Sequence, residues 1–222
     1  MRKQSTLSRK QAKKFYDRYG SKQDSQAYYE DGALERLVKY GDFSSADAVF
    51  EFGCGTGRFA KKLLEEYLHE NATYFGCDIS STMIGFTSER LSKYADRARV
   101  QLIEEFSDLA LQDQSYDRFV SNYVFDLLSF SEITSVLNQA RRLLKTDGLL
   151  CLSGITSGCT PFSRIVMGSW NIIHKIQPAL LGGCRPVDLM NLIGRHSWQI
   201  AHDSKISAFG ISSEVVVARK KG

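Results

Sequence analysis

Three alternate glycines follow a short apolar run in the octapeptide Glu51-Phe52-Gly53-Cys54-Gly55-Thr56-Gly57-Arg58. Residues 48–52 read as a strand, and residues 59–69 carry apolar side chains at helical spacing. Glycine is needed where a backbone turns sharply or must approach a ligand closely. The start of the following helix would offer free N–H groups and positive dipole to that ligand. The octapeptide therefore predicts a strand, a ligand-binding loop and a helix in succession.

Short apolar runs and helical patterns alternate on both sides of this loop. The predicted strands are residues 48–52, 72–78, 99–104, 116–122, 149–155, 198–208 and 213–219. The predicted helices between the first five strands include residues 59–69, 81–94 and 132–144, and residues 145–148 are predicted as a turn. Strands that alternate with helices in this way indicate βαβ units. We expect an α/β fold with a Rossmann-like doubly wound sheet of seven strands, mostly parallel with a C-terminal antiparallel hairpin.

Composition restricts the class of protein further. The chain has 222 residues, 43% hydrophobic and 24% charged, which is typical of one globular domain and excludes a disordered protein. The net charge of +4 is unevenly distributed, because residues 1–22 alone carry +7. Only this N-terminal arm is basic, so a nucleic-acid partner is disfavoured for the rest of the chain. Weak contact of the arm with an anionic membrane stays open.

The five cysteines lack the close spacing of a metal site, so we expect no metal. Their odd number favours reduced thiols in the cytoplasm. The sequence has no apolar run long enough to span a bilayer and no apolar segment typical of a secretory signal. These observations favour a cytoplasmic protein.

An aspartate, Asp78, ends the second predicted strand, 21 residues after Gly57. This spacing places a carboxylate beside the glycine loop, where it can accept hydrogen bonds from ribose hydroxyls. The phosphate-loop pattern G-x-x-x-x-G-K-S/T is absent, and G-x-G-x-G differs from the dinucleotide pattern G-x-G-x-x-G. Glu51, directly before the glycines, suits a cationic ligand better than a pyrophosphate.

The octapeptide resembles the first motif of the class I S-adenosylmethionine (SAM)-dependent methyltransferases. Four later stretches resemble further motifs of this family, so that the resemblance extends over residues 45–156. They are Gly76-Cys77-Asp78-Ile79-Ser80 followed by Met83, Leu102-Ile103-Glu104-Glu105-Phe106, residues 109–117 and residues 141–150. The core is similar to the small-molecule members that act in ubiquinone and menaquinone biosynthesis. The resemblance implies SAM as the cofactor and S-adenosyl-L-homocysteine as its product.

The resemblance also implies roles for individual residues of the cofactor site. The backbone of the glycine loop would pass close to the methionine part of SAM, Glu51 would lie near its ammonium group, and Asp78 would bind the ribose hydroxyls. Glu105, or Glu104 as the alternative, would accept a hydrogen bond from the adenine amino group. The full predicted set is Glu51, Gly53, Cys54, Gly55, Gly57, Asp78, Ile79, Met83, Glu105, Phe106, Asn122 and Tyr123.

The resemblance suggests four segments within a single domain. Residues 1–44 would form the basic arm and a helical lid, and residues 45–156 the SAM-binding Rossmann-like core. Residues 157–197 would form a helical substrate cap, and residues 198–222 a β-hairpin that completes the sheet.

Methyl transfer from a sulfonium needs mainly alignment of the reacting atoms and exclusion of water, because the donor is already activated. A general base is required only if the acceptor atom carries a proton. The candidate catalytic residues are His174, Tyr19 and Asp126, and the candidate substrate contacts are Tyr16, Tyr19, His174 and Arg185.

The acceptor is predicted as a small, partly apolar molecule. Asn122 is not followed by the two prolines that accompany it in enzymes acting on base amines. The segment 157–197 is rich in apolar and aromatic residues, which suits a small apolar acceptor. Two further hypotheses remain open: an RNA or protein methyltransferase that uses the basic arm, and a SAM-binding protein without turnover. The acceptor atom and the oligomeric state are not predicted.

Overall fold

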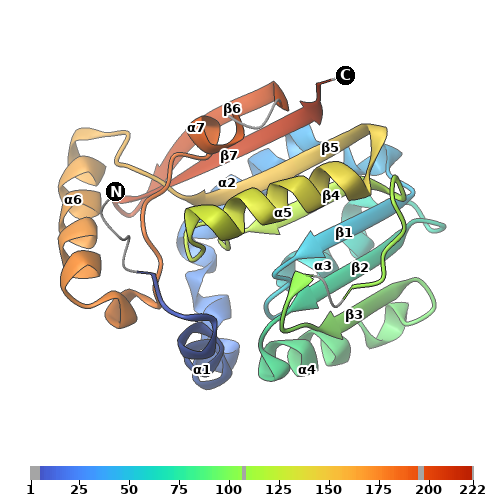
Figure 1. The fold of residues 1–222 in the computed structure, drawn as a ribbon, viewed down its shortest axis with the longest axis horizontal. Helices are drawn as coiled ribbons and strands as arrows, with labels where there is room; N and C mark the ends of the chain where they lie inside the picture. Colours follow the sequence, from blue (N-terminus) through green and yellow to red (C-terminus); the bar gives the residue numbers. More distant parts are fainter. Residues whose placement is uncertain (1–5, 107–108, 195–197, 222) are drawn as a thin grey trace.

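The structure is a computed structural model that describes residues 6–106, 109–194 and 198–221. The ends of the predicted arm and hairpin, residues 1–5 and 222, and residues 195–197 of the predicted cap lie outside the described residues. Seven strands form one sheet in the order β3-β2-β1-β4-β5-β7-β6 (Figure 1). They are β1 (Ala48–Phe52), β2 (Thr73–Asp78), β3 (Ala98–Leu102), β4 (Tyr116–Asn122), β5 (Leu144–Ile155), β6 (Trp198–Ala208) and β7 (Ile211–Lys220).

The first five strands are parallel, whereas β7 runs antiparallel to both β5 and β6. The predicted fold class is therefore confirmed. The parallel strands β1 and β4 are largely buried, and their apolar sequences give them the continuous hydrophobic character of a sheet covered on both faces. From β1, the chain adds strands first on one side and then, at β4, on the other. This reversal opens a crevice at the carboxyl ends of β1 and β4.

Helices cover both faces of the sheet. One face is covered by α5 (Phe130–Leu143) and α7 (Leu189–Gly194), which share a buried hydrophobic cluster with β4. The other face is covered by α2 (Ala27–Gly41), α3 (Arg58–Lys62) and the π-helical turn η3 (Leu63–Tyr67), which share a second buried cluster with β7. Figure 1 shows these two layers in front of and behind the strands. The remaining helical elements are α1 (Arg9–Tyr19), η1 (Gly20–Gln26), η2 (Phe43–Ser45), α4 (Ser81–Arg90), η4 (Ser92–Tyr94), α6 (Pro161–Ile176) and η6 (Pro178–Leu181).

Local sequence signals explain several helix starts. Ser129 and Thr160 each cap a helix, α5 and α6, and form a reciprocal capping box with the residue three positions later. Pro161 occupies the first turn of α6, where its missing N–H costs nothing.

The predicted turn at residues 145–148 is wrong, because β5 already begins at Leu144. Leu144 is fully buried and pairs with Tyr116, while the next pair in the ladder joins Arg118 to Leu149. The intervening residues of β5 form an irregular insertion in the pairing. Residues 145–148 are polar or glycine, a composition typical of a turn. Here they lie inside β5, because the buried residues on either side of them hold the strand in place.

Candidate functional site

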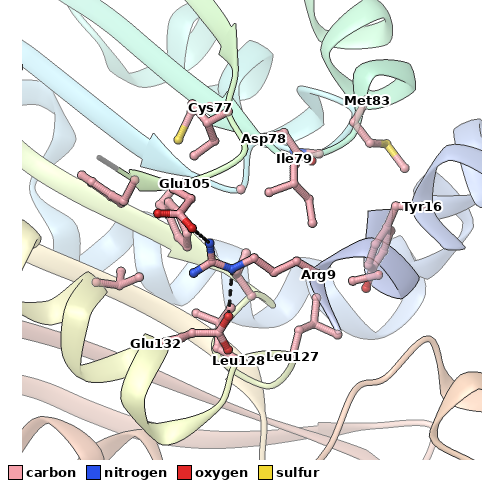
Figure 2. A pocket seen from close by; sticks show the side chains of 18 of the residues that line it. Arg9, Tyr16, Cys77, Asp78, Ile79, Met83, Glu105, Leu127, Leu128 and Glu132 are labelled. Carbon is pink, nitrogen blue, oxygen red and sulfur yellow. Dashed lines mark hydrogen bonds and ion pairs between the residues drawn. The ribbon is translucent and has the colours of Figure 1, made fainter. Parts of the chain in front are cut away.

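A cavity of about 430 Å³ lies at the carboxyl ends of the parallel strands, between α1 and α5. Figure 2 shows side chains from both helices and from β2 converging on it. The predicted cofactor residues that line it are Gly53, Gly55, Asp78, Ile79, Met83, Glu105, Phe106, Asn122 and Tyr123. The predicted residues Glu51, Cys54 and Gly57 are not among its lining residues.

The glycine loop has a conformation that side chains would disrupt. Gly53 and Gly57 have φ angles of 80° and 76°, in the left-handed region that favours glycine. A Cβ atom on Gly53 would lie 2.3 Å from Val124 Cγ2, and one on Gly57 would lie 2.7 Å from Thr87 Cγ2. The loop is tied to β2, because the amides of residues 53 and 54 both donate to the carbonyl of Cys77. Gly57 therefore serves the packing of α4 against the loop.

Asp78 lies at the end of β2, directly beside this loop. Its two carboxylate oxygens accept hydrogen bonds from the amides of Gly55 (3.0 Å) and Ser80 (2.9 Å). Burial raises the pKa of Asp78, and these backbone donors oppose that rise. The carboxylate thus fixes the loop and also faces the cavity.

Glu51 is buried behind the loop, with 1% of its surface exposed. Its carboxylate accepts hydrogen bonds from the hydroxyl of Tyr74 (2.6 Å) and from the side-chain amide of Asn122 (3.2 Å). Burial raises the pKa of Glu51 to about 7. Because Asn122 lines the cavity, it connects this buried acid to the site.

These residues fit a cationic nucleoside cofactor. Glu51 lies behind the glycine loop and accepts hydrogen bonds from two neutral side chains. The glycines leave room for a ligand to contact the loop backbone, and Asp78 faces the same cavity. Gln23 adds a further polar group, since its buried Oε1 has no hydrogen-bond partner within the described part of the chain and its side chain lines the cavity. A Cβ on Gly55 would lie 3.2 Å from Gln23 Nε2, so this amide stands directly over the loop.

Helix α1 covers the cavity and is held there by polar contacts. Asp17 accepts a hydrogen bond from the Ser80 hydroxyl (2.6 Å), and Lys13 donates to the carbonyl of Ile79 (3.3 Å). At the other end of α1, Arg9 lies between Glu105 (3.4 Å) and Glu132 (3.0 Å), as Figure 2 shows. Two basic residues of the arm are thus engaged within the protein, and α1 forms a wall of the site.

A second group of polar residues lies next to the end of β4. Asp126 is fully buried, and neither carboxylate oxygen has a hydrogen-bond partner among the described residues. Burial raises the pKa of Asp126 to about 6. Tyr16, which lines the cavity, lies with its hydroxyl 3.8 Å from Cys184 Sγ, and burial raises its pKa with Cys184 and Asp126 contributing. Tyr123, also in the lining, has a φ of 55°, a strained conformation for an aromatic residue.

Of the candidate catalytic and substrate residues only Tyr16 lines the cavity, and Asp126, described above, is not among its lining residues. The other three, His174, Arg185 and Tyr19, also lie outside the lining. His174 is buried in α6 and its ring nitrogen is 3.1 Å from the carbonyl of Gly183. Arg185 is buried, donates to the carbonyl of Leu128 and lies over the ring of Phe130. Tyr19 stacks on Phe15. These three residues shape the walls around the site, and their direct contact with a substrate stays a prediction.

Several lining residues carry no recognisable sequence signal. Gln23 belongs to a short helix without a motif, and the sequence around Arg9 indicates only a basic arm. One face of α5 contributes Ser131, Glu132, Ser135, Val136 and Gln139. Helical spacing in α5 could have identified this face, but not its position opposite the glycine loop.

Together the fold and the site define a protein of the Rossmann-like α/β class that binds a cationic nucleoside cofactor at the switch point of its sheet. A methyltransferase-domain family model matches residues 50–150. A malonyl-(acyl-carrier protein) O-methyltransferase of Marinomonas sp. is 30% identical over 189 residues, which cover 82% of this chain and 67% of that protein. The chain belongs to the class I SAM-dependent methyltransferases. The predictions of the family and of SAM as its cofactor are confirmed.

Further relatives match over a smaller share of their length. A hybrid PKS-NRPS synthetase of Penicillium oxalicum is 31% identical over 112 residues, which span 49% of this chain and only 3% of that protein. Among solved structures, the N-methyltransferase NodS of Bradyrhizobium japonicum with S-adenosyl-L-homocysteine has a TM-score of 0.71 at 13% identity, covering 96% of this chain and 100% of that one. The (4+2)-cyclase SpnF also has a TM-score of 0.71 at 13% identity and covers 97% of both chains. At this identity the likeness concerns the fold alone.

Metal ligands and membrane-spanning helices were both sought in the structure. Within the described residues, no group of three or more His, Cys, Asp or Glu side chains is placed to hold a metal ion. No helix in the same part of the chain is long and apolar enough to cross a membrane.

Proposed function

We propose that this protein transfers a methyl group from SAM to a small, partly apolar acceptor. The proposal rests on one observation: a single cavity is lined both by the glycine loop with Asp78 and by apolar residues that include Leu127 and Leu128. A cofactor and an apolar acceptor would therefore share one space beneath α1. The Marinomonas relative, named as a methyltransferase, supports the same activity.

The chain's own residues would act mainly by binding and orientation. SAM supplies, when bound, a sulfonium that carries an already activated methyl group. Asp78 and Gln23 would bind the polar groups of SAM. Ile79 and Met83 would pack against its base. Asn122, which donates a hydrogen bond to Glu51, would lie between that acid and the bound cofactor. Helix α1 would exclude water from the reacting atoms, which favours displacement over side reactions. The predicted four-segment organisation is consistent with this division of roles and is part of the proposal.

Asp126 is the best placed candidate for receiving a proton from the acceptor. Its carboxylate is buried, lacks hydrogen-bond partners within the described residues and adjoins the group formed by Tyr16 and Cys184. A buried acid at this position favours an acceptor with a hydroxyl or amine hydrogen over a carboxylate, which it would repel. A malonyl group on an acyl carrier protein, as in the name of the Marinomonas relative, is disfavoured by this charge.

An RNA or protein acceptor and a protein without turnover have less support. Arg9 and Lys13 of the basic arm are engaged in contacts of α1, which reduces the charge available for RNA phosphates. SpnF, named as a (4+2)-cyclase, shows that this fold also occurs in a protein named for another activity. The cytoplasmic setting is part of the proposal, and the five free cysteines would stay reduced there.

A transfer screen with labelled SAM tests the proposal. The protein is incubated with separate pools of metabolites, lipids, RNA and proteins, and label is expected in a small-molecule fraction. Label in RNA or protein would support the corresponding macromolecular acceptor and refute ours. Intact binding of S-adenosyl-L-homocysteine without transfer to any pool would favour a non-catalytic protein.

The role of Asp126 has its own test. Asp126→Asn should lower kcat without changing cofactor affinity, and the wild-type rate should rise with pH through about 6 as the carboxylate ionises. Asp96→Asn, at an exposed acid outside the cavity lining, is the control. An Asp126→Asn variant with unchanged kcat and an unchanged pH profile would exclude Asp126.

A further inference from the structure

Helix α6 has an unusual distribution of apolar side chains. Its inward side buries Ser163, Met167 and His174. A helix that packs on one side normally presents polar residues on the other. Here the outward side is apolar as well, and Figure 1 shows α6 standing outside the two layers that cover the sheet.

The exposed residues follow one stripe of the helix and continue onto its neighbours. Spacings of three, seven and four residues keep Phe162, Ile165, Ile172 and Ile176 on one face of α6. We call the following six residues the apolar face: Phe162 (63% exposed), Ile165 (71%), Ile172 (60%), Ile176 (79%), Leu180 (66%) and Phe209 (76%). Phe209, in the β6–β7 turn, is adjacent because a Cβ on Gly210 would contact Phe162. Contiguous exposed apolar surface of this kind marks an interaction site.

The charged side chains on α6 itself are of one sign. No Asp or Glu occurs between Asp147 and Asp188, whereas Arg164 and Lys175 lie on α6 itself. Helix α1 adjoins the end of η6, since side chains of α1 and of the segment before it lie against the glycines at 182 and 183. Its exposed residues include the cations Lys10 and Lys14. Positive charge on α6 therefore accompanies the apolar face, and α1 adds further cations at the η6 end.

We propose that the apolar face docks on an anionic lipid bilayer, with α6 lying in the plane of the interface. Isoleucine and phenylalanine side chains would enter the boundary between head groups and acyl chains, and the neighbouring cations would contact anionic head groups. A second copy of the chain fits this face less well. Symmetric pairing would bring Arg164 and Lys175 of both copies together, and the segment 148–187 supplies no acid to neutralise them.

Co-sedimentation with vesicles tests the proposal on the full chain. One set of vesicles is phosphatidylcholine alone and the other is equal parts phosphatidylcholine and phosphatidylserine. The protein should sediment with the anionic vesicles and release as salt is raised, because surface charge attraction is screened. Binding to both kinds equally, or to neither, would overturn the proposal.

A double variant localises the contact. Ile165→Gln with Ile176→Gln should lower the partition constant roughly tenfold or more, since two exposed isoleucines lose their transfer into the lipid boundary. Leu102→Gln, at an exposed apolar position in β3, is the matched control and should bind as wild type. Unchanged vesicle binding by the double variant would overturn the assignment of the face.

Sedimentation equilibrium distinguishes the competing occupant. If the wild type is a dimer that the double variant converts to a monomer, and neither binds vesicles, the face is an interface between copies and the proposal is wrong. Affinity for S-adenosyl-L-homocysteine, measured for all variants, reports on folding and on the methyltransferase proposal alone. The two proposals can therefore fail separately.

Discussion

The substitution Asp78→Asn tests the centre of the cofactor site. Both oxygens of Asp78 accept backbone N–H groups, from Gly55 and Ser80. An asparagine offers one acceptor oxygen to this pair and turns its amide nitrogen, a donor, toward the other N–H. One buried donor would then lack a partner, which costs about 1–3 kcal/mol of folding stability. The effect on the cofactor is a separate quantity.

A ribose hydroxyl that donates to a carboxylate forms a charge-assisted hydrogen bond. Losing the charge at residue 78 should cost about 1.5–3 kcal/mol, which corresponds to roughly 10- to 150-fold weaker binding. Isothermal titration with S-adenosyl-L-homocysteine measures this change, and urea unfolding measures the change in stability. Asp96→Asn, at an exposed acid outside the cavity lining, should leave both unchanged. A folded Asp78→Asn protein with wild-type affinity would refute the ribose role.

Three further predictions concern the buried acid, the loop and the lid. Because the folded-state pKa of Glu51 is raised to about 7 from 4.5, stability should fall as pH rises between these values. Glu51→Gln should flatten this slope in unfolding at pH 5 and 8, and a retained slope would contradict the assignment. Gly53→Ala should cost about 1–3 kcal/mol by thermal unfolding, whereas Gly85→Ala, with open space around it, should not destabilise. Arg9→Ala should change stability by less than about 1 kcal/mol but speed dissociation of S-adenosyl-L-homocysteine in stopped flow. An unchanged dissociation rate would exclude a lid role for Arg9.

Several parts of the fold followed from local sequence alone. The bounds of β1, β4 and β6 agree with the predicted strands, because each combines apolar residues with a clear break at its end. The predicted turn at 145–148 failed because composition cannot register that Leu144 is already paired and buried. Helix ends also differ from the prediction: the predicted helix 59–69 is α3 followed by the π-helical turn η3, which ends at Tyr67.

The candidate site divides in the same way. Glycine spacing and the carboxylate at the end of β2 are local signals, so Gly53 and Asp78 could be predicted as neighbours from their order along the chain. Gln23 could not, because its place over Gly55 depends on how η1 packs against the loop. The same holds for Asp126, whose burial near Cys184 and Arg185 depends on the packing of segments far apart in the chain.

Periodicity and residue types at short spacings predicted the class of fold, and the resemblance of the short motifs implied the family and its cofactor, because these are properties of local segments. Which face of α5 closes the cavity, how α1 covers it and why Arg9 is directed inward became apparent only from the folded chain. The exposure of the apolar face of α6 belongs with them. These features depend on contacts between residues far apart in the chain, and the free energy of such contacts is set by the packing of whole elements rather than by any local pattern.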